Sequence, residues 1–399
     1  MRIALVTETF PPEVNGVGRT LLRLSIGLRD KGHELEVVRP THLEEDGSTP
    51  APVPQWVVPG APLPGYPRLR FGFYCRRRLL KRWRQRTPDV IHVATEGPLG
   101  LAAQSAARKL RIPVASSFHT NFHAYGEFYG YGLLTGVALS YLRLFHNRAD
   151  CTLVPSRETV DKLHRYGFRR LGLLTRGVDT ALFDPGRRST ALRRSWGAAQ
   201  EDPVVLYVGR LAKEKNLELA IQVFDDLKEC QPRARCVLVG DGPLETVIAN
   251  RHPDVCMSGL KRGEELAAHY ASGDILIFPS LTETFGNVVL EGMASGLAVV
   301  AFDYAAAGEH ITNGVDGVTV RRGDGLELGR QTMSLASSPA RWREMGMAAR
   351  STAESLTWEA VVDSWESRLR ELTCLLSTDE PLPTFRSAAK LDYSKTQSS

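Results

Sequence analysis

The chain has 399 residues, of which 43% are hydrophobic and 24% charged, and it carries a formal net charge of +5. These proportions are those of a globular protein and exclude a wholly disordered chain, while the length predicts two domains rather than one core. So small a net charge, spread over so long a chain, does not by itself indicate nucleic-acid binding.

Cysteine usage and apolar runs indicate the compartment. The six cysteines are scattered, with no C-x-x-C pair and no Cys/His set at zinc spacing, which favours a reducing cytosol. The apolar run at the N-terminus is short and is followed by Glu8 and two prolines, so we expect neither a signal peptide nor a span there. No apolar run approaches the roughly 18 residues that cross a membrane. We therefore expect a cytoplasmic protein with at most peripheral membrane contact.

Short apolar runs alternate with helical patterns along the chain, which is typical of parallel-sheet α/β domains. In the first half the expected buried strands are residues 3–6, 35–38, 90–93, 113–116 and 151–154. The pattern restarts with expected strands at residues 204–208, 236–239, 275–278, 298–301 and 318–320. The sequence therefore predicts an N-terminal domain over residues 1–183, a connector over 184–203 and a C-terminal domain over 204–356.

The end of the chain has a helical pattern. In residues 357–376 the apolar positions recur every three or four residues, which predicts an amphipathic helix. Residues 377–399 contain few large apolar groups, and we expect this tail to be disordered.

Residues 282–292, TETFGNVVLEG, place two glutamates eight positions apart. They follow the expected strand 275–278, and ligands of open parallel sheets bind beyond the carboxyl ends of the strands. Gly286 and Asn287 then fall at the first turn of the next helix, where unpaired N–H groups and the positive dipole end suit a phosphate. Glu291 lies about five residues, or roughly 7.5 Å, further along that helix. This is about the offset between the phosphate and the ribose of a nucleotide.

The two carboxylates would then have different partners. The two oxygens of Glu291 match a vicinal diol such as that of ribose, and Glu283 would point past the diphosphate toward a sugar. The alternative that spacing alone leaves open is that Glu291 is an exposed helix residue and Glu283 a charge at a helix N-terminus, each contributing under about 1 kcal/mol.

Two further turns follow expected strands. Residues 206–216, LYVGRLAKEKN, deliver Arg210 and Lys215 to the same crevice, and a guanidinium with an ammonium suits a departing diphosphate. The alternative is that these cations are ordinary surface charges. Residues 239–243, VGDGP, lack the third glycine of a G-x-G-x-x-G motif, which argues against a hydride-transfer dinucleotide site.

Taken in order, the motifs GRL-x-x-EK, GDGP, PS-x-x-ETFG and the Glu-x7-Glu pair resemble family 4 of the glycosyltransferases, which are retaining enzymes of the GT-B fold. The first half of the chain agrees, through TETFPP, NGVG, KGHE, SFHT and RGVDT at residues 7–12, 15–18, 31–34, 117–120 and 176–180. The resemblance covers about residues 1 to 370. It implies two Rossmann-like domains that face a cleft, with the C-terminal helix returning to the N-terminal domain.

The resemblance also implies roles for single residues. The nucleotide sugar is expected on the C-terminal domain, with Arg210 and Lys215 on the diphosphate, Glu291 on the ribose and Glu283 on the donor hexose. Backbone groups of the following turn are expected to meet phosphate, namely those of Phe285, Gly286, Asn287 and Val288.

The N-terminal domain is expected to contribute three positions. Gly16 and Gly18, placed in the loop after the first strand, would let backbone N–H groups approach the diphosphate, unless they merely serve a turn. The family match suggests that His119 contacts the donor sugar near its reacting carbon. His119 and His123, four residues apart, also allow a zinc reading, but no third ligand is evident and the family match assigns no metal.

In this family, retention without a protein nucleophile is usually explained by front-face attack, in which the leaving phosphate helps to take the acceptor's proton. The protein then supplies position and charge stabilisation, so His119, Arg210, Lys215 and Glu283 are the expected catalytic residues. We expect no metal and no cofactor, only the nucleotide-diphosphate sugar as donor substrate.

Residues 66–86 hold eight arginines and one lysine without an acid, interleaved with aromatic and aliphatic residues. This segment, from Arg68 to Arg86, would suit an anionic bilayer, each cation near the surface contributing about 1 kcal/mol. The alternative is a solvated basic face with its aromatics in the core. RNA is the other reading of arginines with aromatics, but no RNA-binding module is visible, and we expect no nucleic-acid partner.

The sequence thus predicts a retaining glycosyltransferase that moves a hexose, mannose from GDP-mannose, to a lipid or envelope-glycan acceptor at the inner face of the plasma membrane. UDP-glucose or another UDP-hexose is the rival donor. A sugar-nucleotide epimerase of the same fold, or a binding module that kept the nucleotide site, are alternatives of other classes.

Overall fold

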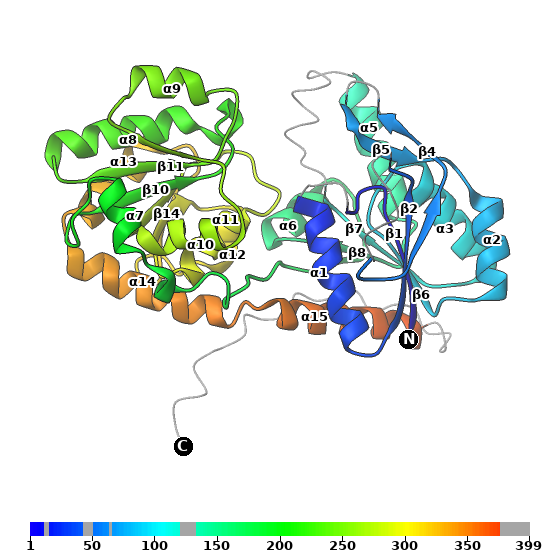
Figure 1. The fold of residues 1–399 in the computed structure, drawn as a ribbon. Helices are drawn as coiled ribbons and strands as arrows, with labels where there is room; N and C mark the ends of the chain where they lie inside the picture. Colours follow the sequence, from blue (N-terminus) through cyan, green and yellow to red (C-terminus); the bar gives the residue numbers. More distant parts are fainter. Residues whose placement is uncertain (12–15, 43–50, 64–65, 120–132, 376–399) are drawn as a thin grey trace. The chain divides into compact units, whose positions relative to one another are not determined.

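The computed structural model describes residues 1–11, 16–42, 51–63, 66–119 and 133–375 of the chain. It divides into two compact units (Figure 1). The first unit contains residues 1–120, 125–174 and 362–399, and the second contains 121–124 and 175–361. The predicted tail, residues 377–399, lies outside the described residues.

The first unit is built on a parallel sheet. In the described residues this sheet has seven strands in the order β3-β2-β1-β6-β7-β8-β9. The strands are β1 (Arg2–Val6), β2 (Glu34–Pro40), β3 (Gln55–Val58), β6 (Val90–Val93), β7 (Val114–Ser117), β8 (Cys151–Val154) and β9 (Leu171–Leu173). A separate antiparallel hairpin consists of β4 (Gly60–Leu63) and β5 (Tyr66–Gly72).

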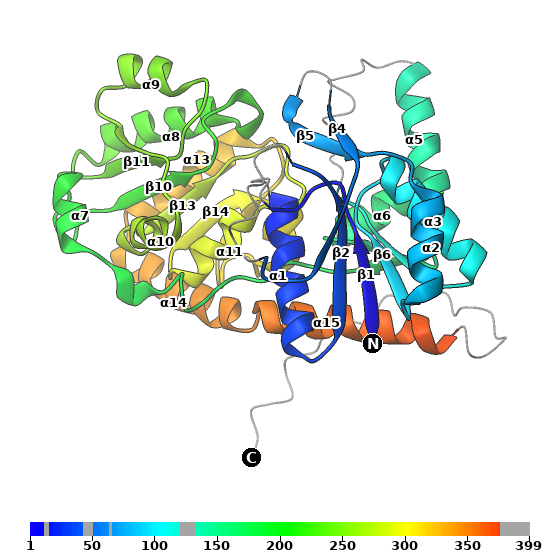
Figure 2. The same ribbon diagram turned by 45° about the vertical axis from the view of Figure 1, so that its right-hand side comes forward.

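Helices cover this sheet because its strands are apolar on both faces. Leu79, Trp83 and Ala103 of α2 and α3, which lie side by side in Figure 2, pack on Ala4, Val6 and other strand residues. The helices of the first unit are α1 (Gly16–Asp30), α2 (Arg76–Gln85), α3 (Pro98–Leu110), α5 (Leu133–His146) and α6 (Arg157–Arg165). The basic segment predicted over 66–86 is therefore a strand, β5, followed by a helix, α2.

The second unit repeats the plan. Its six described strands are all parallel and run in the order β12-β11-β10-β13-β14-β15, so the order reverses between β10 and β13. They are β10 (Val204–Val208), β11 (Arg235–Val239), β12 (Cys256–Gly259), β13 (Ile275–Phe278), β14 (Ala298–Phe302) and β15 (Val318–Val320). Successive strand residues face opposite sides, and two separate apolar clusters result.

Each cluster is closed by its own helices. Val205 and Tyr207 of β10 face the cluster that contains α8 and α13, whereas Leu206 and Val208 face the one that contains α10, α11 and α14 (Figure 1). The helices are η1 (Pro185–Arg187), α7 (Thr190–Ser195), η2 (Lys213–Lys215), α8 (Leu217–Cys230), α9 (Glu245–Arg251), α10 (Gly263–Ser272), α11 (Asn287–Ala294), α12 (Ala305–His310), α13 (Gly325–Ala336) and α14 (Pro339–Glu354).

The stretch 184–203, predicted as a connector, is folded into the second unit. It contains η1 and α7, and Arg193 of α7 is 2% exposed. The guanidinium of Arg193 donates to Asp274 Oδ2 (3.0 Å) and to the carbonyl oxygens of Ser272 (2.8 Å) and Asp202 (2.7 Å). The sequence pattern did not predict α7, because this helix is attached to the rest of the unit by polar contacts of Arg193 and not by a periodic row of apolar side chains.

Helix α15 (Trp358–Leu375) begins in the second unit and ends in the first, as predicted for the C-terminal helix. The buried indole of Trp365 donates from Nε1 to His92 Nδ1 over 2.8 Å. Glu366 on the same helix bonds Lys31 (2.7 Å) and His33 (3.0 Å), and chiefly the Lys31 bond lowers its pKa to about 2. His33 is therefore a structural contact of α15. No helix in the described part of the chain is both long and apolar enough to cross a membrane.

Candidate functional site

The candidate site of the second unit lies where the strand order reverses, between β10 and β13. The loops after these two strands must meet there, since parallel strands end at the same edge. Lys215 Nζ donates to Thr282 O (3.3 Å), Asn216 Nδ2 to Pro279 O (3.2 Å) and Thr282 Oγ1 to Glu214 O (3.1 Å). The two loops thus form one surface.

Glycines allow a third loop to pack on the first. A Cβ added to Gly240 would lie 1.9 Å from Gly209 O, and one on Gly242 would lie 2.5 Å from Leu211 O. Both glycines also have positive φ, 145° and 154°. The GDGP motif is therefore required by close backbone packing against the GRL motif.

Lys215 and Glu283, predicted for the diphosphate and the hexose, are in direct contact. Lys215 Nζ lies 2.5 Å from Glu283 Oε1, and the same oxygen accepts from Ser280 Oγ at 2.8 Å. The side chains of Lys215 and Glu283 are 23% and 13% exposed. A half-buried ion pair of this kind holds both charges at the carboxyl edge of the sheet.

Arg210 is placed differently. Its side chain is 65% exposed, and its ion pair within the described chain is with Glu214, at 3.3 Å. A surface pair of this kind contributes little to stability and leaves the guanidinium able to turn. The expected convergence of Arg210 and Lys215 on the diphosphate stays a prediction.

The turn after β13 lies at the start of the next helix, where the sequence placed it. Gly286 caps α11 with φ 91° and ψ 61°, a left-handed conformation that favours glycine, and Asn287 and Val288 open the helix. Phe285 is buried, and its carbonyl accepts from Ala306 N at 2.7 Å. The buried Oδ1 of Asn287 has no hydrogen-bond partner in the described structure, so this turn retains an unused acceptor.

Glu291 lies on α11, where Tyr270 fixes it. The Tyr270 hydroxyl donates to Glu291 Oε2 at 2.9 Å. Tyr270 is fully buried on α10, and burial together with the Glu291 charge raises the pKa of its phenol well above the usual value. The phenol therefore stays a donor, and it orients a carboxylate that sequence reasoning had assigned without a supporting residue.

Sequence reasoning gave no role to Arg176, although it quoted the RGVDT motif. Its guanidinium carbon lies 5.6 Å from the centroid of the Phe285 ring, and Arg176 is 7% exposed. Burial lowers its pKa to about 10, an effect that the Glu283 charge opposes. The available signal was its place in the RGVDT motif, three residues after β9.

The first unit holds the other predicted positions. Gly16 and Gly18 are not loop residues, because α1 begins at Gly16 and both lie in its first turn. Their expected backbone contact with the diphosphate stays a prediction. His119 is half-buried two residues after β7, and His123 lies outside the described residues. The described residues contain no group of three potential metal ligands.

A buried carboxyl, which sequence reasoning did not single out, stands at the carboxyl edge of the first sheet. Glu8 follows β1, and its Oε1 accepts from Leu99 N, in the first turn of α3, at 2.9 Å. A Cβ on Gly97 would lie 1.8 Å from Glu8 Oε2, so glycine is needed there. Burial raises the pKa of Glu8 to about 7.

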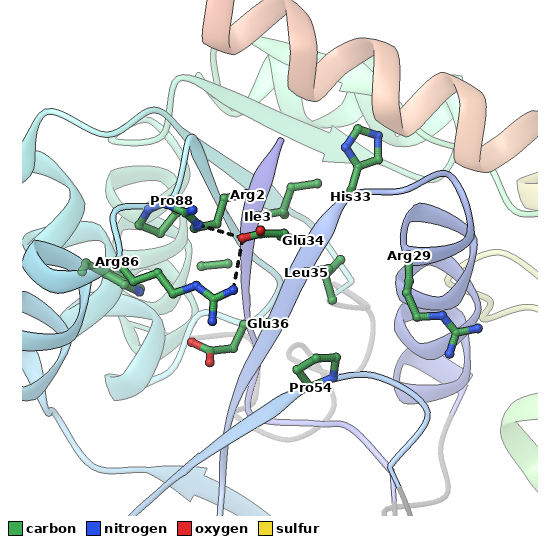
Figure 3. Close-up of a pocket in the computed structure, with 12 residues that line it drawn as sticks. Arg2, Ile3, Arg29, His33, Glu34, Leu35, Glu36, Pro54, Arg86 and Pro88 are labelled. Atoms are coloured by element: carbon green, nitrogen blue, oxygen red, sulfur yellow. Dashed lines mark hydrogen bonds and ion pairs between the residues drawn. The ribbon is translucent and has the colours of Figure 1, made fainter.

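A pocket of about 230 Å³ in the first unit contains none of the predicted site residues. It lies at the amino ends of β1 and β2, opposite the edge at which parallel sheets bind ligands. Figure 3 shows Arg2 and Arg86 both directed at Glu34, at 3.0 and 3.1 Å. Arg2 and Arg86 of this pocket are thus already paired with a carboxylate of the protein.

Solved structures place this fold. The sucrose-phosphate synthase of Thermosynechococcus elongatus has a TM-score of 0.74 at 19% identity, covering 94% of this chain and 99% of that one. Anabaena HepE, solved with UDP, has a TM-score of 0.73 at 19% identity, covering 93% and 100%. At such identities the likeness concerns the fold alone. The chain has the GT-B fold, as predicted.

Family models and curated relatives go further. Residues 14–182 match the model Glycosyltransferase Family 4, and residues 188–352 match Glycosyl transferases group 1. A GDP-mannose-dependent alpha-mannosyltransferase of Mycolicibacterium smegmatis is 35% identical over 91% of this chain and 95% of its own. The protein of that name from Corynebacterium glutamicum is 32% identical, covering 90% and 86%. The chain belongs to glycosyltransferase family 4, and it is a glycosyltransferase.

A more distant relative uses another description. The alpha-monoglucosyldiacylglycerol synthase of Acholeplasma laidlawii is 25% identical over 85% of this chain and 89% of its own. Relatives whose names contain different sugars are thus similar to this protein over most of its length.

Proposed function

We propose that this glycosyltransferase transfers mannose from GDP-mannose, with retention of configuration and without a metal, to a lipid or envelope-glycan acceptor. The observation that carries the proposal is the Lys215–Glu283 contact at the reversal between β10 and β13. The donor choice is supported by the printed names of the two mannosyltransferases at 35% and 32% identity. A UDP-hexose is the alternative donor, and the printed name of the monoglucosyldiacylglycerol synthase supports glucose as the alternative sugar.

The roles follow from the geometry of the second unit. The amino end of α11, with Gly286 to Val288, would seat the diphosphate, because its N–H groups and dipole favour an anion. Glu291, oriented by Tyr270, would accept from the ribose hydroxyls. Glu283 would exchange its bond with Lys215 for one with a hexose hydroxyl, which frees the Lys215 ammonium for the phosphate.

In the proposed reaction the bond between the hexose and the leaving phosphate oxygen breaks as the acceptor oxygen attacks from the same face. The acceptor's proton passes to the departing phosphate, and the protein supplies position and positive charge. Arg210 and Lys215 would offset the charge on the diphosphate, while Gly16, Gly18 and His119 of the first unit are the residues proposed to meet the donor from the other domain.

A thermal-shift panel tests the donor. GDP, UDP and ADP are compared, because a ligand at 100 times its Kd adds about 2.7 kcal/mol to the stability of the protein. GDP is expected to raise the Tm most, and a shift with UDP but not GDP would refute the donor choice. Product analysis with the labelled sugar nucleotide then separates transfer to an acceptor from epimerisation and from binding without reaction.

The acceptor is proposed to lie in an anionic membrane at the cytoplasmic face, contacted through Arg68 to Arg86. On α2 the buried side is Leu79 and Trp83, and the exposed side is Arg77, Arg78, Lys81 and Arg84. Those four cations have no ion pair within the described structure, and the neighbouring Phe73 and Tyr74 are 48% and 56% exposed. A cationic face beside exposed aromatics suits an anionic lipid surface.

Salt-sensitive binding to vesicles of anionic lipid tests this contact. Changing Arg77, Arg78 and Lys81 to glutamine should abolish it, whereas the same change at Arg233, Arg262 and Arg343 of the second unit should not. Undiminished binding of the first variant would remove the basis for the membrane proposal.

A further inference from the structure

Arg176 is held at a fixed place in the second unit by the backbone on its C-terminal side. Val178 N donates to Leu356 O at 2.8 Å, and Val178 forms a bridge with Thr357. A Cβ on Gly177 would lie 2.6 Å from Trp358 N. The backbone of the RGVD segment thus packs closely against the junction between α14 and α15, and these contacts fix the position of the Arg176 backbone.

The Arg176 guanidinium is buried without a hydrogen bond or an ion pair in the described part of the chain. Its neighbours are the Phe285 ring, at 5.6 Å, and the charge of Glu283, whose Oε1 is already engaged by Lys215 and Ser280. An arginine has five N–H donors, and none of those of Arg176 has an acceptor among the described residues.

Two other arginines of this unit, the buried Arg193 and the half-buried Arg350, have partners for their guanidinium groups. Arg193 bonds Asp274 and several carbonyl oxygens. Arg350 donates to the carbonyl oxygens of Thr180, Phe183 and Ala294 and pairs with Asp184. Both guanidinium groups make structural contacts with protein acceptors, so this unit does provide acceptors for an arginine that has only a structural role.

Keeping Arg176 buried and charged opposes folding of the free protein. Its pKa is lowered to about 10 by burial, so the folded state binds this proton less tightly than the unfolded state, yet the group stays charged at neutral pH. A buried charge is tolerated when a partner of opposite charge compensates it. The described residues around Arg176 offer only Glu283, which is shared with Lys215.

We propose that Arg176 binds the sugar-linked phosphate of the donor, from the side of Phe285 and Glu283. This rests on the proposed use of a nucleotide-diphosphate sugar, but not on which base or hexose it carries. The place fits, because Phe285 directly precedes the Gly286 cap of α11, where the phosphate is expected, and Glu283 is the expected hexose contact. A guanidinium fork matches two phosphate oxygens, and its fixed charge would also offset the charge that this phosphate gains as it leaves.

The test compares Arg176→Met with Arg193→Met, two changes that remove a buried guanidinium and keep its apolar length. Urea unfolding without ligand measures stability, and titration with GDP, UDP and GMP measures affinity. Arg176→Met should leave the free protein as stable as the wild type or more so, and should weaken binding of the nucleoside diphosphate about ten- to hundredfold. Binding of GMP, which lacks the second phosphate, should change less than about threefold.

The control and the second variant sharpen the result. Arg193→Met should destabilise the free protein, because Asp274 keeps only Arg188 of its two arginine partners and the buried carbonyl oxygens of Ser272 and Asp202 lose their donor. Arg176→Lys keeps the charge but not the fork, so it should recover part of the lost affinity.

A failure of Arg176→Met to fold, or an unchanged affinity for the diphosphate, would overturn the assignment. An equal loss for GMP and GDP would also overturn it, since the second phosphate would then not be the contact. If the wild-type protein binds no nucleoside diphosphate, the proposed function fails first, and the role of Arg176 falls with it.

Discussion

Glu8 offers a measurable link between pH and stability. Its carboxyl is largely buried between the end of β1 and the first turn of α3, and burial raises its pKa from 4.5 to about 7. The folded state therefore binds the proton of the Glu8 carboxyl more tightly than the unfolded state does. The stability that this proton binding contributes is complete below pH 4.5 and is lost as the pH rises toward 7. At about 1.36 kcal/mol per pKa unit, the full effect is about 3 kcal/mol.

The perturbation is Glu8→Gln, an uncharged analogue of the protonated acid. Urea unfolding of both proteins at pH 5 and pH 8 gives the free energy of unfolding. The variant should gain about 2 to 3 kcal/mol relative to the wild type between these two pH values, since it has no charge to bury. Contributions from the other titrating groups are common to both proteins and cancel in the difference.

The matched control is Glu34→Gln, at the opposite end of the same sheet. Hydrogen bonds from Arg2 and Arg86 lower the pKa of Glu34, so its linkage has the opposite sign and acts below pH 4.5. This variant should keep the wild-type dependence between pH 5 and pH 8. If Glu8→Gln shows the same pH dependence as the wild type, the carboxyl of Glu8 is not desolvated as described and the reasoning fails.

Three further predictions concern the site and the core. Lys215→Met should lower kcat more than it weakens donor binding, because the ammonium is needed most when the phosphate leaves, and a variant in which KM alone rises would contradict this. Tyr270→Phe removes the donor to Glu291 and should weaken nucleotide binding up to about tenfold, measured by calorimetry, and an unchanged Kd would show that Glu291 needs no orientation. Trp365→Phe leaves a buried His92 nitrogen without its donor and should lower the free energy of unfolding in urea by about 1 to 3 kcal/mol. An unchanged free energy would show that this hydrogen bond of α15 does not stabilise the protein.

The candidate site illustrates how far motifs reach. The place of the turn at Gly286 was predicted, because a glycine after a strand and before a helical pattern is a local signal, whereas its left-handed conformation came only from the structure. The meeting of Lys215 with Glu283 required the loops after two strands that are far apart in the sequence, β10 and β13, to be brought together in the sheet. Tyr270 and Arg176 were missed because what marks them is burial next to a distant residue. Tyr270 lies in none of the quoted motifs, and the RGVDT motif of Arg176 was given no ligand.

The sequence by itself determined the strands that fill both sheets. Ten expected runs, from residues 3–6 to 318–320, all became strands, because a strand buried on both faces must be continuously apolar. It also determined the order of the motifs and the family. Apolar runs and motifs are properties of short segments, so they can be recognised without knowing which distant residues the segment contacts.

Only the tertiary structure decided three of the four edge strands of the sheets and the partners of the charges; the fourth edge strand, β15, was predicted. The short strands β3, β9 and β12 lie toward or at the sheet edges, where fewer apolar residues are needed, so no strong pattern marks them. The same holds for α7, which is held by Arg193, and for the contrast between Arg193 with its partners and Arg176 without them. Whether a charge is satisfied depends on residues tens or hundreds of positions away, and such distances leave no local pattern in a sequence.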